Sequence, residues 1–357
     1  MTASALFKRN PKLTRRSFTL LGASTLASLS VAYLTGCSGT SSSASSGANA
    51  SSNSAASDPC ETTFFAFDTV ITLSAYCEQS VLDQAQERCT YFENIFSRTI
   101  DGSDISKINS AKGQPVEVAE ETADIISKSL EYSKETNGLF DISIGAASSL
   151  WDFNEGIKPS DKKLKEAIKH IDYRNIAVEG TTVTLADPDA KLDLGGIAKG
   201  YIADDLAKLF KEAGCKSACL NLGGNVYVLG TKPDGSNWKV GVYDPNSDGD
   251  EAVIASCEAA DKSIVTSGLY ERNFTKDGVM YYHILDPKTG YPAKTDLLAS
   301  SIYSEKSVDG DAYATTLFLL GHDKALEFLE EHPEIQGLVV NSKDKVSTTD
   351  NSPFEVL

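Results

Sequence analysis

The stretch Leu192-Asp193-Leu194-Gly195-Gly196-Ile197-Ala198-Lys199-Gly200 decides how the fold is interpreted, because an apolar segment passes here through two glycines into a helical pattern. Glycine lets the backbone approach a ligand closely, and the N-terminus of a following helix favours an anion such as phosphate. A tight strand-to-helix turn would need the same glycines without any ligand, so both interpretations stay open. The stretch is not a Walker loop, since neither Ser nor Thr follows Lys199, and it does not match GxGxxG.

Strands and helices are mixed irregularly around this stretch. Alternation of apolar residues predicts strands, and apolar residues at intervals of three and four predict helices. The predicted strands cover residues 67–75, 182–185, 191–194, 218–222, 226–229, 239–243 and 263–266. The predicted helices cover residues 82–96, 120–136 and 202–213, a region from about Asp311, and a last helix before Pro333. No regular βαβ alternation and no internal repeat occurs, so we expect an α+β fold.

The N-terminus has the pattern of an export signal. Five basic residues precede an apolar stretch, Phe18 to Leu34, and no acidic residue occurs before Asp58. The run Thr14-Arg15-Arg16-Ser17-Phe18-Thr19-Leu20 resembles a twin-arginine leader. Leu34-Thr35-Gly36-Cys37 resembles a lipobox, in which cleavage leaves a lipidated Cys37. An uncleaved anchor helix is the alternative interpretation. We expect residues 1–36 to be a twin-arginine-type lipoprotein signal peptide.

A linker rich in serine follows this leader. Residues 38–57 carry no charge and consist almost wholly of Ser, Ala, Gly and Asn, a composition typical of a flexible tether. We therefore assign residues 37–60 to the lipidated cysteine and the linker, and residues 61–357 to one large domain or two closely joined ones. The chain would be anchored by lipid to the cell membrane and face its extracytoplasmic side.

The charge balance argues against nucleic acid as a partner. The chain has a net charge of −17, and removal of the five basic residues before Cys37, which no acidic residue offsets, takes it to −22. A nucleic-acid binder needs a basic face, and no basic run occurs after Arg16.

Six cysteines remain beyond Cys37, and an even number permits disulfides in an oxidising compartment. Six cysteines allow fifteen connectivities, and the sequence does not choose among them. Cys89 lies on the apolar stripe of a predicted helix, which indicates a core residue. The six are Cys60, Cys77, Cys89, Cys215, Cys219 and Cys257.

Three further residues have side chains suited to chemistry. Asp311 and Thr315 are four apart in a helical pattern, so a carboxylate and a hydroxyl face the same way and suit Mg²⁺. A capping Asp with a solvated Thr is the alternative. His283 ends a predicted strand before a turn and is a candidate general base, although a lone strand histidine is more often structural.

Taken together and in order, these segments resemble the FAD:protein FMN transferase (ApbE-like) family. The resemblance covers nearly the whole predicted domain. The matching segments are FDTVITLSAY from Phe67, FSRTIDGSDISKIN from Phe96, TNGLFDISIG from Thr136, LDLGGIAKGY from Leu192, LNLGGNVYVLG from Leu220, TSGLYERNF from Thr266, HILDPKTGYP from His283 and DGDAYATTLFLLG from Asp309.

The resemblance implies a T-fold-like α+β unit of two joined subdomains, with FAD in the cleft between them. It implies that Mg²⁺ is held by Asp311, Thr315 and the backbone carbonyl of Gly196, and that His283 is the candidate base. The residues that fall at FAD contacts are Phe67, Leu139, Phe140, Asp141, Asp193, Lys199 and Leu285.

Two positions depart from the pattern of the family. Phe67 replaces the more usual Met, which alters packing on the flavin. Thr99 lies where some members place a tyrosine beside FAD, and variation there is associated with a choice between transferring FMN and hydrolysing FAD.

The function that the resemblance implies is Mg²⁺-dependent transfer of FMN from FAD to a threonine hydroxyl of another protein, with release of AMP. The acceptor would be an exported or membrane redox flavoprotein. An extracytoplasmic FAD pyrophosphatase that yields FMN and AMP is one alternative. A non-catalytic flavin-binding lipoprotein is another.

Overall fold

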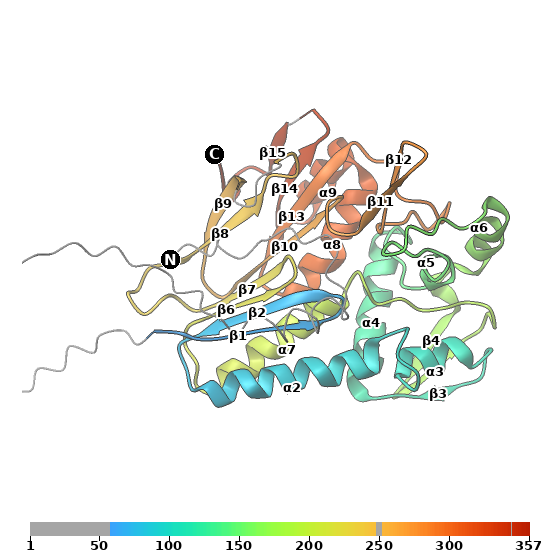
Figure 1. The fold of residues 1–357 in the computed structure, drawn as a ribbon, viewed down its shortest axis with the longest axis horizontal. Helices are drawn as coiled ribbons and strands as arrows, with labels where there is room; N and C mark the ends of the chain where they lie inside the picture. Colours follow the sequence, from blue (N-terminus) through green and yellow to red (C-terminus); the bar gives the residue numbers. More distant parts are fainter. Residues whose placement is uncertain (1–57, 248–251, 344) are drawn as a thin grey trace, which may run out of the picture.

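The computed structural model describes residues 58–247, 252–343 and 345–357, and it has the predicted α+β architecture (Figure 1). The expected signal peptide, Cys37 and nearly all of the linker lie outside the described residues, so those assignments stay predictions. The centre is an eight-stranded antiparallel sheet of order β1-β2-β6-β7-β10-β13-β14-β15. Its strands are β1 (Cys60–Ala66), β2 (Thr69–Ala75), β6 (Ala218–Leu222), β7 (Asn225–Leu229), β10 (Lys262–Gly268), β13 (Leu297–Ser304), β14 (Gln336–Asn341) and β15 (Val346–Thr348).

Both faces of the large sheet are covered, and the alternation along its strands assigns residues to one side or the other. In β7, Tyr227 and Leu229 belong to the core beneath the helices, whereas Val226 and Val228 pack toward a second sheet. The helices of the first side are α2 (Gln79–Phe96), α7 (Ala198–Glu212), α8 (Ser307–Leu320) and α9 (His322–Glu331). The second sheet has the order β16-β9-β8, formed by β16 (Phe354–Val356), β9 (Val253–Ala259) and β8 (Trp238–Tyr243).

Helix α2 shows how the periodicity of the sequence becomes packing. The predicted stripe of apolar residues at intervals of three and four is buried, and Cys89 within it is fully buried, as expected of a core residue. Arg88, the residue before Cys89, instead pairs with Asp205 of α7 at 2.8 Å. One face of α2 is therefore fixed against the sheet, and its flank is tied to α7.

The start of the sheet was predicted only in part. The predicted strand over residues 67–75 begins at Thr69, and β1 precedes it. Phe67 and Asp68 form the two-residue turn between the strands, both with positive φ, 54° and 57°. Such a turn matches the twist of a hairpin but is unusual for a bulky residue, because the left-handed region crowds its side chain. The apolar alternation runs through the turn and conceals it in the sequence.

A second, smaller region lies beside the sheet and follows α2 in the chain (Figure 1). It contains a three-stranded sheet of order β3-β5-β4 and several short helices. Its elements are α3 (Asp104–Ser110), β3 (Val116–Glu117), α4 (Glu120–Glu135), α5 (Gly145–Ser148), α6 (Asp161–Ala167), β4 (Ile176–Glu179) and β5 (Thr182–Leu185), and a separate hairpin is formed by β11 (Asn273–Lys276) and β12 (Val279–Tyr282).

Residues 191–194 were predicted as a strand, and this was wrong. Apart from an isolated bridge between Lys191 and Ile144, the segment pairs with no strand among the described residues. The side chain of Asn109 takes the place of a strand partner, because its amide donates to the carbonyl of Leu192 and its carbonyl accepts from the N–H of Leu192. The segment is thus an extended lead into α7.

Helices α7 and α8 cross in direct backbone contact. A Cβ on Gly200 would lie 2.4 Å from the carbonyl oxygen of Ser307 and 2.7 Å from the Cα of Val308, so only glycine fits. Helix α8 begins at Ser307, four residues before the expected start at Asp311. Asp311 therefore lies in the second turn and does not cap its own helix.

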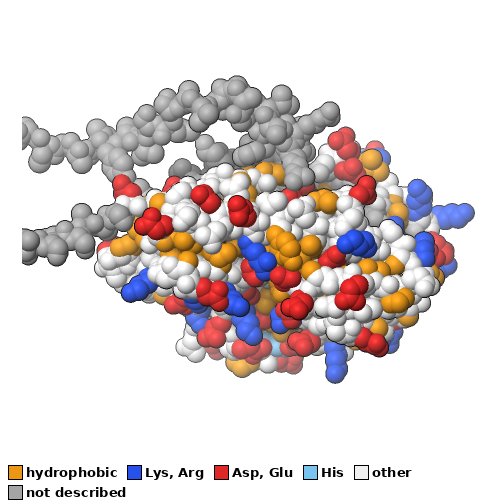
Figure 2. All heavy atoms as spheres, turned by 90° about the horizontal axis from the view of Figure 1, so that it is seen from below, with side chains coloured by type: hydrophobic (Ala, Val, Ile, Leu, Met, Phe, Trp, Pro, Cys, Tyr) orange, Lys and Arg blue, Asp and Glu red, His pale blue; other side chains and the backbone are white. Residues whose placement is uncertain are grey.

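The surface bears on possible partners. On the face shown in Figure 2, basic and acidic side chains are interspersed. None of the helices within the described residues combines the length and apolar character needed to cross a membrane.

Candidate functional site

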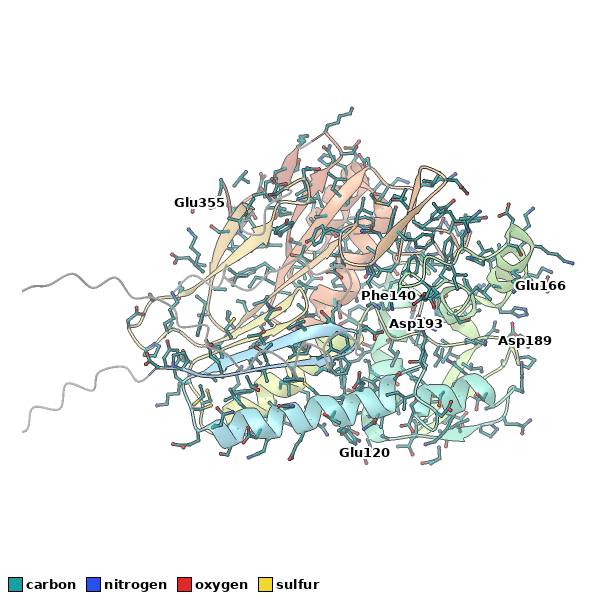
Figure 3. The ribbon with its side chains drawn as sticks, in the orientation of Figure 1. Glu120, Phe140, Glu166, Asp189, Asp193 and Glu355 are labelled. Carbon is teal, nitrogen blue, oxygen red and sulfur yellow. The ribbon has the colours of Figure 1, made fainter. Side chains whose placement is uncertain are left out.

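A cavity of 320 Å³ opens where the end of the large sheet meets the smaller region. Figure 3 shows Phe140 and Asp193, both lining residues, close together in this central position. The cavity is at the lower end of the range of small-molecule sites. All twelve site residues predicted within the described chain line it, namely Phe67, Thr99, Leu139, Phe140, Asp141, Asp193, Gly196, Lys199, His283, Leu285, Asp311 and Thr315.

Asp193 organises the glycine turn before α7. Its Oδ1 accepts the N–H of Gly195 at 2.9 Å, and its Oδ2 accepts the hydroxyl of Ser148 at 2.6 Å. The guanidinium of Arg98 lies 3.1 Å from Oδ2. Burial opposes ionisation of this carboxyl, but Arg98, Ser148 and Gly195 outweigh it and hold the pKa of Asp193 below its usual range. The turn is therefore fixed around an ionised carboxylate.

Asp311 presents a carboxylate with unequal oxygens. It is almost fully buried, and its Oδ2 accepts the N–H of Gly200 at 2.9 Å. Its Oδ1 has no hydrogen-bond donor among the described residues, and the nearest cation is Lys199 Nζ at 3.8 Å. One oxygen thus holds the first turn of α7, while the other is left for a ligand.

Two more residues that could supply an oxygen ligand to a metal ion line the same cavity, namely Thr315 and Gly196. The hydroxyl of Thr315 lies one helical turn after Asp311, where it donates to the carbonyl of Asp311 at 3.4 Å and keeps its own lone pairs. Gly196 lies against it, since a Cβ there would be 3.5 Å from Thr315 Oγ1. A carboxylate, a hydroxyl and a backbone carbonyl are hard oxygen ligands of the kind that Mg²⁺ prefers. The donor set fits the predicted metal.

His283 follows β12 and faces the same cavity. Its Nδ1 is buried without a hydrogen-bond partner, and its Nε2 lies 4.0 Å from Oε2 of Glu271. Burial and then the cations Arg272 and Lys199 lower the pKa of His283 to about 3. The imidazole is therefore neutral near pH 7 and has a lone pair for a proton.

The sequence does not single out five further charged residues that line the cavity, namely Asp68, Glu93, Arg98, Glu271 and Arg272. Glu271 and Arg272 lie within the TSGLYERNF segment and Arg98 within FSRTIDGSDISKIN, so both segments had been recognised without these side chains. Burial raises the pKa of Glu271, and Lys199 and Arg272 oppose the shift. The contact of Arg98 with Asp193 and that of Glu271 with His283 form only in the folded chain.

The predicted Leu139-Phe140-Asp141 segment forms a wall. Phe140 is buried, and the carboxylate of Asp141 accepts from Ser143 through one oxygen and from the N–H of Tyr173 at 2.9 Å through the other. Burial raises the pKa of Asp141 even so. Both oxygens are engaged, so the structure gives Asp141 a part in holding this wall.

The remaining predicted residues differ in exposure. Phe67 is half-buried at the hairpin turn, where its N–H donates to Glu93. Leu285 is buried in a small apolar cluster that includes Trp151. Thr99 is exposed at the rim and bonds only locally, with the hydroxyl of Ser97 at 3.1 Å. The cavity thus has apolar walls, a cationic and acidic floor, and an open edge at Thr99.

Comparison with known proteins finds relatives that cover most of the chain. The chain is 35% identical over 266 residues to an FAD:protein FMN transferase of Treponema pallidum, covering 70% of this chain and 73% of the relative. It is 34% identical over 254 residues to one of Klebsiella pneumoniae, covering 70% and 78%.

Solved structures show the same fold. The ApbE protein of Thermotoga maritima superposes with a TM-score of 0.76 at 30% identity, covering 82% of this chain and 97% of that one. The flavin transferase ApbE of Vibrio cholerae, at 22% identity, gives a TM-score of 0.74 over 82% and 97%. Residues 67–339 match the model of the ApbE family, and the chain therefore belongs to this family.

Proposed function

We propose that this protein transfers FMN from FAD to a threonine hydroxyl of another protein in a Mg²⁺-dependent reaction that releases AMP. The observation that carries the proposal is the carboxylate of Asp311. One of its oxygens accepts the N–H of Gly200, while the other has no donor among the described residues. Asp311 lines the same cavity as Thr315, Gly196 and Lys199. The relatives named FAD:protein FMN transferase support the same activity.

The floor of the cavity suits a pyrophosphate. Lys199, Arg272 and Arg98 supply positive charge, and the N-terminus of α7 adds backbone N–H groups. Asp311, Thr315 and the carbonyl of Gly196 would hold Mg²⁺. The ion would neutralise negative charge on the pyrophosphate and on the departing AMP. These residues bind and orient FAD so that the phosphorus of its FMN half is reachable from the open edge.

His283 is the group placed to take a proton. The acceptor hydroxyl loses its proton as its oxygen attacks the FMN phosphorus, and a neutral imidazole can receive it. The anionic pyrophosphate offsets the charges of Lys199 and Arg272, so FAD binding raises the pKa of His283 and makes it a better base. Glu271, 4.0 Å away, then stabilises the imidazolium that forms.

The proposed location rests on the N-terminal sequence, and the proposed partner rests on the resemblance to the family. The twin-arginine-like leader and the lipobox at Cys37 support a lipid-anchored protein on the extracytoplasmic side of the cell membrane. The acceptor would accordingly be an exported or membrane redox flavoprotein with a target threonine.

The test is incubation of the full-length protein with FAD, Mg²⁺ and a flavoprotein acceptor. Flavin fluorescence that stays on the acceptor after denaturation, with an equal amount of AMP, is the expected result. Intact FAD and a dark acceptor after trials with several acceptors would contradict catalysis and favour a flavin-binding lipoprotein.

The exposure of Thr99 favours a second candidate activity, FAD pyrophosphatase. No large side chain at this position closes the rim of the cavity, so water has the same access as an acceptor hydroxyl. Formation of FMN and AMP without an acceptor, at a rate that an acceptor does not change, would identify the hydrolase.

A further inference from the structure

Three of the six described cysteines gather at one end of the large sheet, away from the cavity. Cys60 is the first residue of β1 and pairs with Ala75 at the end of β2. Cys77 follows two residues later, and Cys215 precedes β6, whose Ala218 is the other neighbour of Ala75. All three cysteines pack on the same core beneath the helices.

Cys77 and Cys215 are linked through one backbone oxygen. The carbonyl of Ser217 accepts the N–H of Tyr76 at 2.9 Å and the thiol of Cys215 at 3.4 Å. The thiol of Cys215 therefore lies beside the residue that precedes Cys77. After burial, the Cys215 thiol does most to raise the pKa of Cys77 and Cys60 does less, so Cys215 is its stronger thiol neighbour.

The other three cysteines provide a contrast. Cys89 is fully buried within α2, while Cys219 and Cys257 pack on the opposite face of the sheet. Burial raises the pKa of each thiol to about 12, and among the described residues no other cysteine contributes to these shifts. Cys77 differs because a second thiol faces it.

We propose that Cys77 and Cys215 are a disulfide-forming pair, oxidised when the protein meets a disulfide oxidant, with Cys60 as a neighbouring thiol that stays reduced. Two S–H bonds break and one S–S bond forms. The two electrons and two protons pass to the disulfide of the oxidant, oxidised glutathione or a thiol oxidoreductase, which becomes two thiols.

We expect the disulfide to raise the stability of the fold and to leave the reaction at the cavity unchanged. It closes a loop of about 140 residues, a length for which restriction of the unfolded chain gives a large stabilisation. It joins the end of β2 to the connection between α7 and β6. The cavity lies at the Phe67–Asp68 end of the hairpin, about 20 Å away for seven extended residues.

The thiols also predict a slow reaction. Burial and the neighbouring Cys215 raise the pKa of Cys77 to about 12, so few thiolates are present at neutral pH. We expect oxidised glutathione to act over hours and a thiol oxidoreductase to act faster.

The experiment treats folded full-length protein with oxidised glutathione, alkylates the remaining thiols and maps peptides without reduction. A peptide pair joining residues 77 and 215 is expected, together with a melting temperature higher by on the order of 5 °C than after reduction. Cys77→Ser and Cys215→Ser should each abolish the pair and the shift. Cys60→Ser and Cys219→Ser are the matched controls and should keep both.

Several results would overturn the proposal: a Cys60–Cys77 pair, glutathione adducts without a protein disulfide, or unchanged thiols after treatment with the oxidoreductase. If a serine variant fails to fold, the Cys60→Ser protein still decides, because Cys77 and Cys215 are then the pair of neighbouring thiols left at this end of the sheet in the described part of the chain. The inference does not depend on flavin transfer, and oxidation should leave that activity unchanged.

Discussion

The first turns of α7 and α8 are built alike, but only one of them faces the cavity. Each receives a carboxylate from the other helix. Asp204 of α7 accepts the N–H groups of Ser307 and Val308 at the start of α8, at 2.7 and 3.0 Å. Asp311 of α8 accepts the N–H of Gly200 at the start of α7. Asp204 fills both oxygens in this way, whereas Asp311 fills one.

The difference separates a structural carboxylate from a functional one. Both residues satisfy helix N–H groups that would otherwise lack partners. Only Asp311 keeps an oxygen for a ligand, and it lines the same cavity as Thr315 and Gly196. The same capping contact thus serves packing at one helix and positions a ligand site at the other.

The largest effect is expected from Asp311→Asn. The amide oxygen can still accept the N–H of Gly200, so the fold should persist, but the charge that holds Mg²⁺ is lost. We expect FMN transfer to fall by on the order of 10³-fold, measured as flavin fluorescence on the acceptor. Asp204→Asn is the matched control and should stay within a few-fold of the wild type. Equal losses in both variants would remove the distinction.

His283→Gln is expected to lower kcat by about 100-fold while FAD affinity changes little, because a general base acts on the reaction and not on binding. In the wild type, the free enzyme has a neutral His283 down to about pH 3. The profile of kcat/KM should therefore have no acidic limb near pH 6.5, and the limb in kcat should lie at higher pH than that in kcat/KM. A limb at pH 6.5 in kcat/KM that vanishes in His283→Gln would contradict this.

The protonation of Asp204 should change the free energy of unfolding as the pH changes. Burial raises its pKa to about 6, although the N–H groups of Ser307 and Val308 oppose the shift. The folded state thus holds a proton that the unfolded state loses above about pH 4, so this residue makes the protein less stable as pH rises from 4 to 6. Denaturant unfolding at pH 4 and 7 should show Asp204→Asn gaining about 2 kcal/mol relative to the wild type. A constant difference would mean that Asp204 does not titrate as described.

The smallest effect is expected from Glu271→Gln. This change removes the negative charge 4.0 Å from His283 Nε2, so the imidazolium formed in the reaction is less stable. We expect kcat to fall by about tenfold and the acidic limb of the kcat profile to move to lower pH. Glu305→Gln is the control, since that exposed carboxylate pairs with Lys262 at 3.0 Å and does not line the cavity. A limb that does not move would leave Glu271 without this role.

The predicted site residues line one cavity, whereas the backbone around them departs from the prediction at two places. The helical spacing of Asp311 and Thr315 is equally compatible with a capping Asp and a solvated Thr, and the resemblance to the ApbE-like family singles them out as metal ligands. Phe67 was placed in a strand although it lies in a turn of positive φ, because apolar alternation does not register a two-residue reversal. The apolar pattern of residues 191–194 predicts a strand, but it does not show that Asn109, 83 positions from Leu192, takes the place of a strand partner there.

Charge partners across the fold were beyond the reach of the sequence. The pKa of His283 depends on Arg272 and Lys199, which approach it only in the folded chain. In Asp141 and Asp204 both carboxylate oxygens accept hydrogen bonds, whereas in Asp311 only one does. The sequence does not show this difference, because donors such as the N–H groups of Tyr173 and Ser307 come from distant residues.

The most direct test of whether Asp311 holds the metal ion is electron paramagnetic resonance of Mn²⁺, used in place of Mg²⁺, in the presence of FAD. The wild type and Asp204→Asn should both bind the ion in a protein–FAD complex, and Asp311→Asn should leave it free in solution at the same concentrations. Equal binding by Asp311→Asn would contradict the assignment of the metal to Asp311 and, with it, the account of the site.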